Sequence, residues 1–229
     1  MTKTGWIIFA TAVIVGLGGL IAWTRITNPP LDVSSVETAT ILAASAESGD
    51  IADRAKGNVE SKVVLIEHGD FQCPGCGSVA PHVQTLMSEY GDKIAFVFRN
   101  FPLTSIHPNA KAAAAVAEAA GLQGKYWEMH NHLFSSQSEW SNADVKTRTD
   151  IFNSYAESLG LDLEKFTSDI AGTQVAQKLK FDAALGKKSG VTGTPAFFIG
   201  SEQVDDETTN SFISGDTAKI KELLDAKLK

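Results

Sequence analysis

The sequence contains very little cysteine: only Cys73 and Cys76 among 229 residues. No second C-x-x-C pair and no H-x-x-x-H pair accompanies them, which argues against a four-ligand zinc site. Basic runs are also missing. Of the 20 Lys and Arg residues, Lys3 and Arg25 lie in the first 27 positions, so 18 remain against 27 acidic residues. This acidic remainder argues against nucleic-acid binding.

Charge is absent from one long apolar run near the N-terminus. Trp6–Trp23 contains eighteen residues without an ionisable side chain. As a helix it would span roughly 27 Å, close to the ~30 Å hydrocarbon core of a bilayer. We therefore expect residues 1–27 to form a single-pass membrane anchor. The alternative is a cleaved signal peptide, although "LAASAES" at 42–48, which resembles a cleavage site, lies well beyond the run.

The charges beside this run predict its orientation only weakly. Lys3 and the terminal amine precede it and Arg25 follows it. The positive-inside rule then favours a cytoplasmic N-terminus and an extracytoplasmic body, where thiols can be oxidised and stay oxidised.

Composition divides the rest of the chain into a linker and one domain. Residues 28–58 are rich in Ser, Thr, Ala and Asp and begin with Pro29-Pro30 after a single Asn. We interpret them as a linker with a short helix near Val36–Ala46. The compact domain is expected to cover residues 59–229.

Hydrophobic patterning predicts an α/β fold for this domain. A β-branched run at 62–69 indicates a buried strand, 74–90 a helix and 93–101 a second strand. A strand–helix–strand unit of this length favours parallel pairing. Residues from about 108 to 188 are helical in character, 190–200 return to strand composition, 201–210 read as a polar loop, and 216–228 form a terminal helix.

Three interpretations of the cysteine pair are open. A metal half-site would need further ligands, and His68 and His82 alone do not complete a recognisable motif. A static staple across so short a loop would stabilise little. A reactive dithiol is favoured, because Cys73 directly precedes Pro74 at the start of a predicted helix, whose free N–H groups favour an anion. Cys76, one turn into that helix, would be the more buried, resolving thiol.

Other candidate residues have simpler interpretations. We expect His107 to end a loop before a helix, and His130 and His132 to occupy different helical faces. The segment 190–193 lacks the lysine of a phosphate-binding loop. No nucleotide, flavin or metal cofactor is expected, and the redox group would be the Cys73–Cys76 disulfide itself.

Four segments taken together resemble the DsbA-like branch of the thioredoxin superfamily. They are "EHGDFQCPGC", "RNFPLTSIHPNAKAAAAVAEAA", "GKYWEMHNHLF" and "GVTGTPAFFIG", and the resemblance covers the chain from about Val59 to the C-terminus. It implies a thioredoxin-like fold with an inserted all-helical subdomain. It also implies thiol–disulfide exchange on exported proteins.

The resemblance assigns roles to individual positions. Cys73 matches the attacking cysteine and Cys76 its partner, while Glu67 matches a buried acid that relays protons beneath the active-site helix. Thr194 and Pro195 match the cis-proline loop, which contacts substrate beside Pro74 and Gly75 of the active site. Because the backbone of Thr194 can pair with an extended strand, this loop is expected to bind peptide.

Two positions depart from the pattern of the family. Gly75 stands where the best-known oxidant of the family has histidine, which removes a possible cation beside the thiolate and predicts a milder oxidant. His68 stands where an aromatic residue is common, and it would supply positive charge if it faced the site.

The sequence therefore predicts a membrane-anchored, extracytoplasmic enzyme that forms disulfides in thiol-containing exported proteins. A quinone-linked thiol oxidase of the membrane (DsbB/VKOR-like) would reoxidise it. The alternatives are a disulfide reductase or isomerase, and a non-catalytic, chaperone-like binding module.

Overall fold

The computed structural model describes residues 2–27 and 31–229, which divide into the units Met1–Asp32 and Val33–Lys229. Helix α1 (Lys3–Thr27) belongs to the first unit. Within the described residues, no helix combines the length and the apolar character needed to cross a membrane. The structure thus does not support the predicted membrane span over Trp6–Trp23. The agreement with the prediction is limited to the helical conformation of Lys3–Thr27.

The second unit is built on a five-stranded sheet in the order β1–β3–β2–β4–β5. Strand β2 (Val64–Gly69) pairs in parallel with β3 (Ala95–Asn100), and α2 (Pro74–Tyr90) connects the two. This arrangement confirms the predicted β-α-β unit. The remaining strands pair antiparallel: β1 (Arg54–Gly57) with β3, β4 (Ala196–Ile199) with β2, and β5 (Glu202–Gln203) with β4.

Alternation along the central strands separates two apolar cores. Leu65 and Phe96 belong to a large core with the buried residues of α2, whereas Val64, Ile66 and Val97 form a smaller core on the opposite face of the sheet. Since side chains of a strand alternate between faces, Glu67 lies on the α2 side and His68 on the other. This separation decides which polar side chains of β2 can approach the cysteines.

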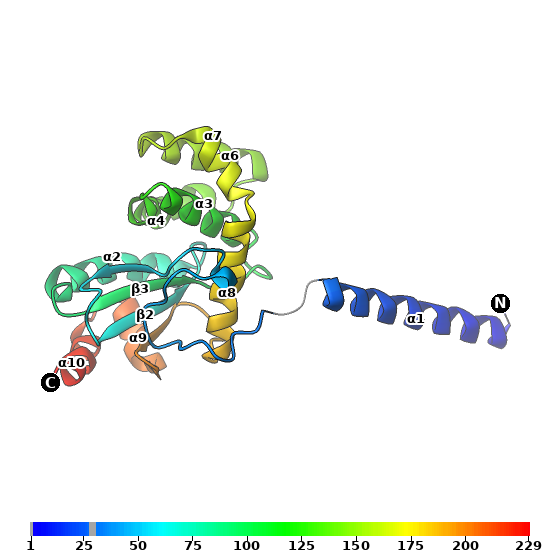
Figure 1. The fold of residues 1–229 in the computed structure, drawn as a ribbon, viewed down its shortest axis with the longest axis horizontal. Coiled ribbons are helices and arrows are strands. Elements are labelled where there is room, and N and C mark those ends of the chain that lie inside the picture. Colours follow the sequence, from blue (N-terminus) through cyan, green and yellow to red (C-terminus); the bar gives the residue numbers. More distant parts are fainter. Residues whose placement is uncertain (1, 28–30) are drawn as a thin grey trace. The chain divides into compact units, whose positions relative to one another are not determined.

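Six helices occupy the interval predicted as helical. Figure 1 shows α8 extending from the other inserted helices down along the sheet, so this helix joins the two parts of the unit. Their bounds are α3 (Ala110–Leu122), α4 (Tyr126–Ser135), α5 (Gln137–Trp140), α6 (Val145–Ser158), α7 (Leu163–Ile170) and α8 (Thr173–Lys188).

The C-terminal segment contains one helix more than predicted. Residues 201–210, predicted to be a polar loop, include β5 and the start of α9 (Asp206–Ile213). The helix begins there because the Asp205 carboxylate accepts a hydrogen bond from the N–H of Thr208 and caps it. Helix α10 (Ala218–Lys227) follows, close to the prediction.

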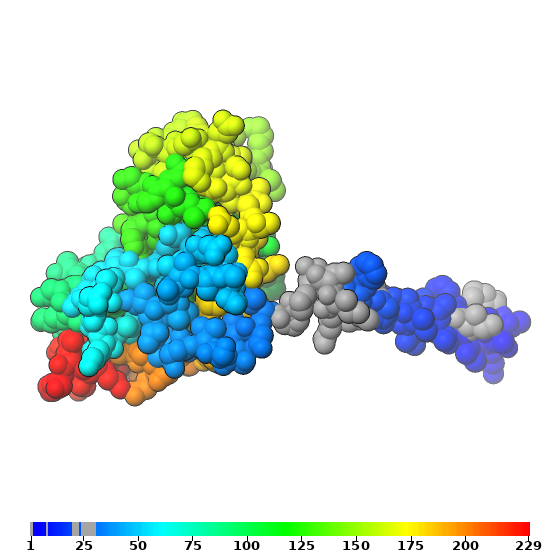
Figure 2. Space-filling view, in the orientation of Figure 1, coloured from blue at the N-terminus to red at the C-terminus, as the bar shows by residue number. Residues whose placement is uncertain are grey.

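The predicted linker is folded from Val33 onward. Figure 2 shows residues 33–53, which we term the N-terminal arm, packed on the second unit. Val33 and Ile51 are buried, and Lys188 of α8 donates to two carbonyl oxygens of the arm. The expected helix near Val36–Ala46 is wrong, since only a 3-10 turn, η1 (Ala46–Ser48), forms. Partners distant in the sequence stabilise the arm, which composition alone could not reveal.

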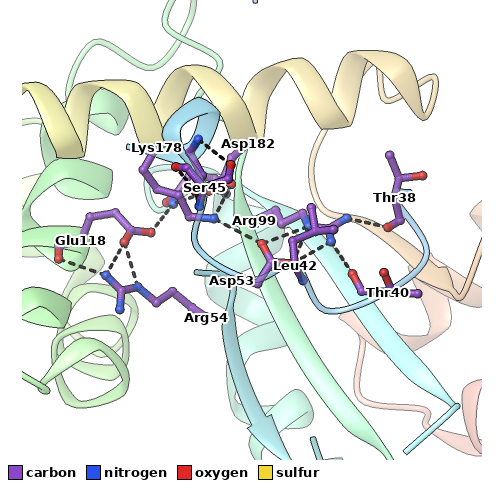
Figure 3. Close-up of polar contacts among 12 residues, drawn as sticks. Thr38, Thr40, Leu42, Ser45, Asp53, Arg54, Arg99, Glu118, Lys178 and Asp182 are labelled. Carbon is purple, nitrogen blue, oxygen red and sulfur yellow. Dashed lines mark hydrogen bonds and ion pairs between the residues drawn. The ribbon is translucent and has the colours of Figure 1, made fainter. Parts of the chain in front are cut away.

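A buried ion cluster attaches the arm to the sheet and α8 (Figure 3). Asp53 lies 2.7 Å from the Arg99 guanidinium and 3.2 Å from the Lys178 ammonium, and Lys178 also pairs with Asp182 at 2.7 Å. All four side chains are fully buried. Arg99 additionally donates to the carbonyl oxygens of Thr38 and Thr40 in the arm.

Candidate active site

Cys73 lies at the N-terminus of α2, as predicted. It is the N-cap residue with an extended backbone, and Pro74 is the first helical residue. Both cysteines are free thiols, and the Cys73 Sγ lies 3.2 Å from the carbonyl oxygen of Thr194. Cys73 is 7% exposed and Cys76 is completely buried, which confirms the predicted difference in access.

The surroundings of Cys73 stabilise its thiolate. The hydrogen bond from the Cys76 thiol is the main cause that lowers the Cys73 pKa to about 5. Burial opposes it, while Thr194 and the N–H groups of Cys76 and Gly75 add to the lowering. The Thr194 hydroxyl is buried and has no hydrogen-bond partner among the described residues. The sequence predicted the contribution of the helix N–H groups but not the larger one from Cys76.

Cys76 has the opposite tendency. Burial, followed by its hydrogen bond to Cys73 and the charge of Glu67, raises the Cys76 pKa well above its ordinary value. At neutral pH one sulfur is therefore an anion and the other a protonated donor. This pairing can start and resolve a mixed disulfide.

Glu67 lies buried on the side of the sheet that carries α2. Burial raises its pKa to about 8; the ammonium of Lys56 opposes this shift and the charge of Cys73 adds to it. Its Oε1 has no hydrogen-bond partner in the described part of the chain. The carboxyl group therefore holds a proton at neutral pH within electrostatic reach of both thiols. A role in moving protons remains a prediction.

His68 does not supply positive charge to the site, which corrects the expectation from sequence. Its ring contacts Phe101 and Phe198 on the far side of the sheet, and a Cβ at Gly186 of α8 would lie 3.1 Å from its Nδ1. Burial, reinforced by the charge of Arg99, lowers the His68 pKa to about 3, so the ring is neutral. Strand alternation places it away from the cysteines.

The Thr194–Pro195 peptide bond is cis, as the resemblance implies. The loop approaches the active-site helix closely, since a Cβ at Gly75 would lie 3.1 Å from Pro195 Cδ and 3.8 Å from Cys73 Sγ. A pocket of about 280 Å³ adjoins this loop, with Thr194, Pro195 and Asp206 among its lining residues. Gly75 thus lies next to Pro195 and Ile213, two residues that line this pocket.

Several residues around the cysteines were not singled out by the sequence. Gln137 of α5 donates to the carbonyl oxygen of Cys73 at 2.9 Å and to that of Phe71 at 2.7 Å. Gln72 accepts a 2.6 Å hydrogen bond from the N–H of Asn109. The sequence offered only one signal for these contacts, a polar residue, Gln72, directly before the C-x-x-C motif. The contacts themselves could not be predicted, because the bonded residues are more than thirty positions apart in the sequence.

His130 and His132 both pack against aromatic side chains. The ring of His130 is buried among aromatic residues including Phe98 and Trp127, and burial lowers its pKa to about 3. His132 stacks on Tyr155. Across residues 2–27 and 31–229, no group of three or more His, Cys, Asp or Glu side chains is placed to hold a metal ion.

Comparisons with known proteins agree with this geometry. Residues 50–215 match the family described as Thioredoxin. A segment of 147 residues, 64% of this chain, is 41% identical to a Na(+)/H(+) antiporter NhaA 1 of Salinispora arenicola. That segment corresponds to 21% of the antiporter, so the match spans about a fifth of the length of this curated relative.

Two solved structures are similar in fold. A thioredoxin-like oxidoreductase from Silicibacter pomeroyi is 25% identical, with a TM-score of 0.57, over 74% of this chain and 92% of that one. The thiol-disulfide exchange protein alpha-DsbA2 from Wolbachia pipientis is 21% identical, with a TM-score of 0.61, over 79% of this chain and 89% of that one.

The paired thiols at the start of α2, within this fold, define a thiol–disulfide oxidoreductase. The chain belongs to the Thioredoxin family, and its structural neighbours include DsbA-type exchange proteins.

Proposed function

We propose that the protein is an oxidase that forms disulfides in exported proteins through Cys73 and Cys76. The observation that carries this proposal is the lowered pKa of Cys73, to about 5, which stabilises the reduced protein. Each unit by which the pKa is lowered stabilises the thiolate by about 1.4 kcal/mol relative to the thiol. Because the reduced protein is stabilised, its disulfide is reduced more readily and is a stronger oxidant.

The cycle follows from the difference between the two thiols. A substrate thiolate attacks the Cys73 sulfur of the protein disulfide, forms a mixed disulfide and releases Cys76 as a thiolate, which takes up a proton. A second substrate thiolate then attacks the substrate sulfur of the mixed disulfide and releases Cys73 as a stabilised thiolate. The substrate loses two electrons and two protons; the protein gains both electrons and one proton, on Cys76, and the other proton goes to solvent. A quinone-linked membrane thiol oxidase is the proposed oxidant that regenerates the disulfide.

Substrate binding is proposed at the cis-proline loop. The carbonyl oxygen of Thr194 contacts Cys73, and the pocket beside Pro195 gives room for a residue that flanks the substrate cysteine. An extended peptide can pair with the backbone of such a loop in the manner of an added strand. Backbone contacts of this kind depend little on the side chains of the bound peptide, which suits an enzyme with many substrates.

We also propose that the domain acts outside the cytoplasm, attached through residues 1–27. This part rests on the uncharged sequence of Trp6–Trp23 and on the oxidising conditions that a stable disulfide needs. Cell fractionation with alkaline extraction tests the attachment. Release of the intact chain into the soluble fraction contradicts it.

The direction of transfer is tested by equilibrium with glutathione. An oxidase with a glycine at position 75 is expected to have a reduction potential between about −120 and −200 mV, whereas about −270 mV is typical of thioredoxin and would contradict the proposal. Cys73→Ser should abolish oxidation of a dithiol peptide. Cys76→Ser, the matched control, should still react once with glutathione disulfide through Cys73, release one reduced glutathione and accumulate a protein–glutathione mixed disulfide. Equal activity of both variants and wild type would instead favour a non-catalytic binding module.

A further inference from the structure

Asp70 is a fully buried carboxylate three residues before the attacking cysteine. It accepts three N–H groups. Oδ1 receives the backbone N–H of Gln72 at 2.7 Å, and Oδ2 receives the backbone N–H of Leu103 and Nδ1 of His107, both at 2.8 Å. Three donors on one buried carboxylate satisfy it well, so its position is strongly restrained.

The backbone of Asp70 contacts both cysteines directly. Its N–H points to the Sγ of Cys76 at 3.5 Å, and its carbonyl oxygen accepts the N–H of Cys73 at 3.0 Å. The bond from Gln72 to Oδ1 closes a side-chain turn over the same residues. The carboxylate therefore fixes the turn that presents Cys73 and approaches Cys76.

His107 comes from the loop between β3 and α3, 37 residues after Asp70. A carboxylate oxygen has no proton to donate, so Nδ1 of His107 carries the hydrogen of this bond. The backbone of the loop is restrained at this point, because the backbone N–H of His107 donates to the carbonyl oxygen of Leu103 at 2.9 Å. Asn109, two residues later, donates to Gln72, which gives the same loop a second contact with the active-site turn.

We infer that His107 is a positioning residue for the reactive thiols, acting through Asp70. The inference deepens the proposed function and rests on it. His107 touches neither sulfur, but it donates one of the three hydrogen bonds that hold the Asp70 carboxylate and hence the turn at Cys73.

Loss of this donor would leave a buried carboxylate with one partner fewer, which costs more than the net value of an ordinary hydrogen bond. The turn would relax, and the N–H groups of Gly75 and Cys76 would be less well aligned with the Cys73 sulfur. The Cys73 thiolate would be less stable, and the equilibrium with glutathione would shift toward the protein disulfide.

The test compares three versions of the full-length protein. His107→Leu removes the donor, and His107→Asn keeps an N–H near the place of Nδ1 without an imidazole. His132→Leu is the matched control in the helical region, where the ring only stacks on Tyr155. The measurements are the Cys73 pKa, from thiolate absorbance, and the equilibrium constant with glutathione. Thermal unfolding is recorded beside them.

We expect His107→Leu to raise the Cys73 pKa and to shift the glutathione equilibrium at least threefold toward the disulfide. His107→Asn and His132→Leu should keep wild-type values. A His107→Leu protein that is less stable but keeps the wild-type pKa and equilibrium constant overturns the inference. If that variant does not fold, His107→Ala, which also lacks the donor, replaces it, and wild-type values of the Cys73 pKa and the equilibrium constant in the Ala variant overturn the inference. Failure of the wild type to exchange with glutathione would instead overturn the proposed function.

Discussion

Cys73 and Cys76 differ in ionisation although they are separated by two residues. Their shared hydrogen bond stabilises the anion on the Cys73 sulfur and the proton on the fully buried Cys76 sulfur, since it acts in opposite directions on the two pKa values. Glu67 adds a third titrating group with a pKa of about 8. The site thus contains three titratable groups, and at neutral pH Cys76 and Glu67 are protonated while Cys73 is ionised.

Glu67 gives the first prediction at this scale. Its folded pKa, about 8, lies above the ordinary value near 4.5. Its contribution to stability is therefore fully present below pH 4.5 and is lost as the pH rises through about 8. Relative to wild type, reduced Glu67→Gln should gain on the order of a few kcal/mol in unfolding free energy between pH 5 and pH 9.

Urea unfolding of the reduced proteins at the two pH values measures this difference. Glu60→Gln, at an exposed position, serves as the control and should follow wild type. Parallel curves for the Glu67 variant and wild type would contradict the burial effect.

Single residues could be predicted from the sequence where a motif fixed them. The cysteines and the cis proline belong to such motifs, and so does Glu67, whose burial is confirmed and whose role in proton transfer stays a prediction. The orientation of His68 could not, because alternation says that Glu67 and His68 face opposite sides but not which side carries the active-site helix. Asp70 was missed since its role depends on His107, which only the fold brings close.

At the scale of elements, the close approach of α2 and the cis-proline loop shapes the site. Position 75 sits between them, where an added Cβ would lie 3.1 Å from the ring of Pro195. This distance is tight, so a side chain there shifts its neighbours by a few tenths of an ångström. The same Cβ would lie 3.8 Å from the sulfur of Cys73, so a cationic side chain at position 75 would start close to the thiolate.

Gly75→His should therefore lower the Cys73 pKa further and make the disulfide more oxidising. Gly75→Ala is the matched control, because it introduces the steric contact without charge. We expect the His variant to differ from the Ala variant by roughly half a unit to one unit of pKa, or about three- to tenfold in the equilibrium with glutathione. Equal pKa values for the two variants would contradict an electrostatic effect of this position.

Elements with a regular hydrophobic period were predictable, and those without one were not. The pattern at 62–101 allowed the strand, helix and parallel strand to be predicted. Both strands contain a continuous apolar run because they are buried on both faces of the sheet. Helix α9 was missed, since its first turn consists of acidic and Thr residues that also favour loops. Its start depends on one capping bond of Asp205.

At the scale of the whole molecule, the N-terminal arm completes the second unit. The linker interpretation of residues 28–58 followed from their composition, which is rich in Ser, Thr, Ala and Asp. In the structure the arm supplies Asp53 to two buried cations and backbone oxygens to Arg99. Burial is the largest single effect on the Asp53 pKa and raises it, but the charges of Lys178 and Arg99, together with hydrogen bonds from Arg99 and Leu42, outweigh it, so the pKa is lowered.

Asp53→Asn should therefore destabilise the protein strongly, by about 3–5 kcal/mol, because it leaves buried cations without a full counter-charge. Asp150→Asn is the control. It removes an exposed partner of Lys146 and should change the unfolding free energy by less than about 1 kcal/mol. Denaturant unfolding at neutral pH measures both. A small effect at Asp53, similar to the control, would mean that the arm is only loosely attached.

The central claim concerns the ionisation of one sulfur, and a thiolate titration of the reduced protein tests it most directly. The account predicts one thiol that ionises with a midpoint near pH 5 and that disappears in Cys73→Ser. The second thiol should stay protonated past the ordinary cysteine range. A midpoint for Cys73 near the ordinary value of about 8.5 would contradict the account.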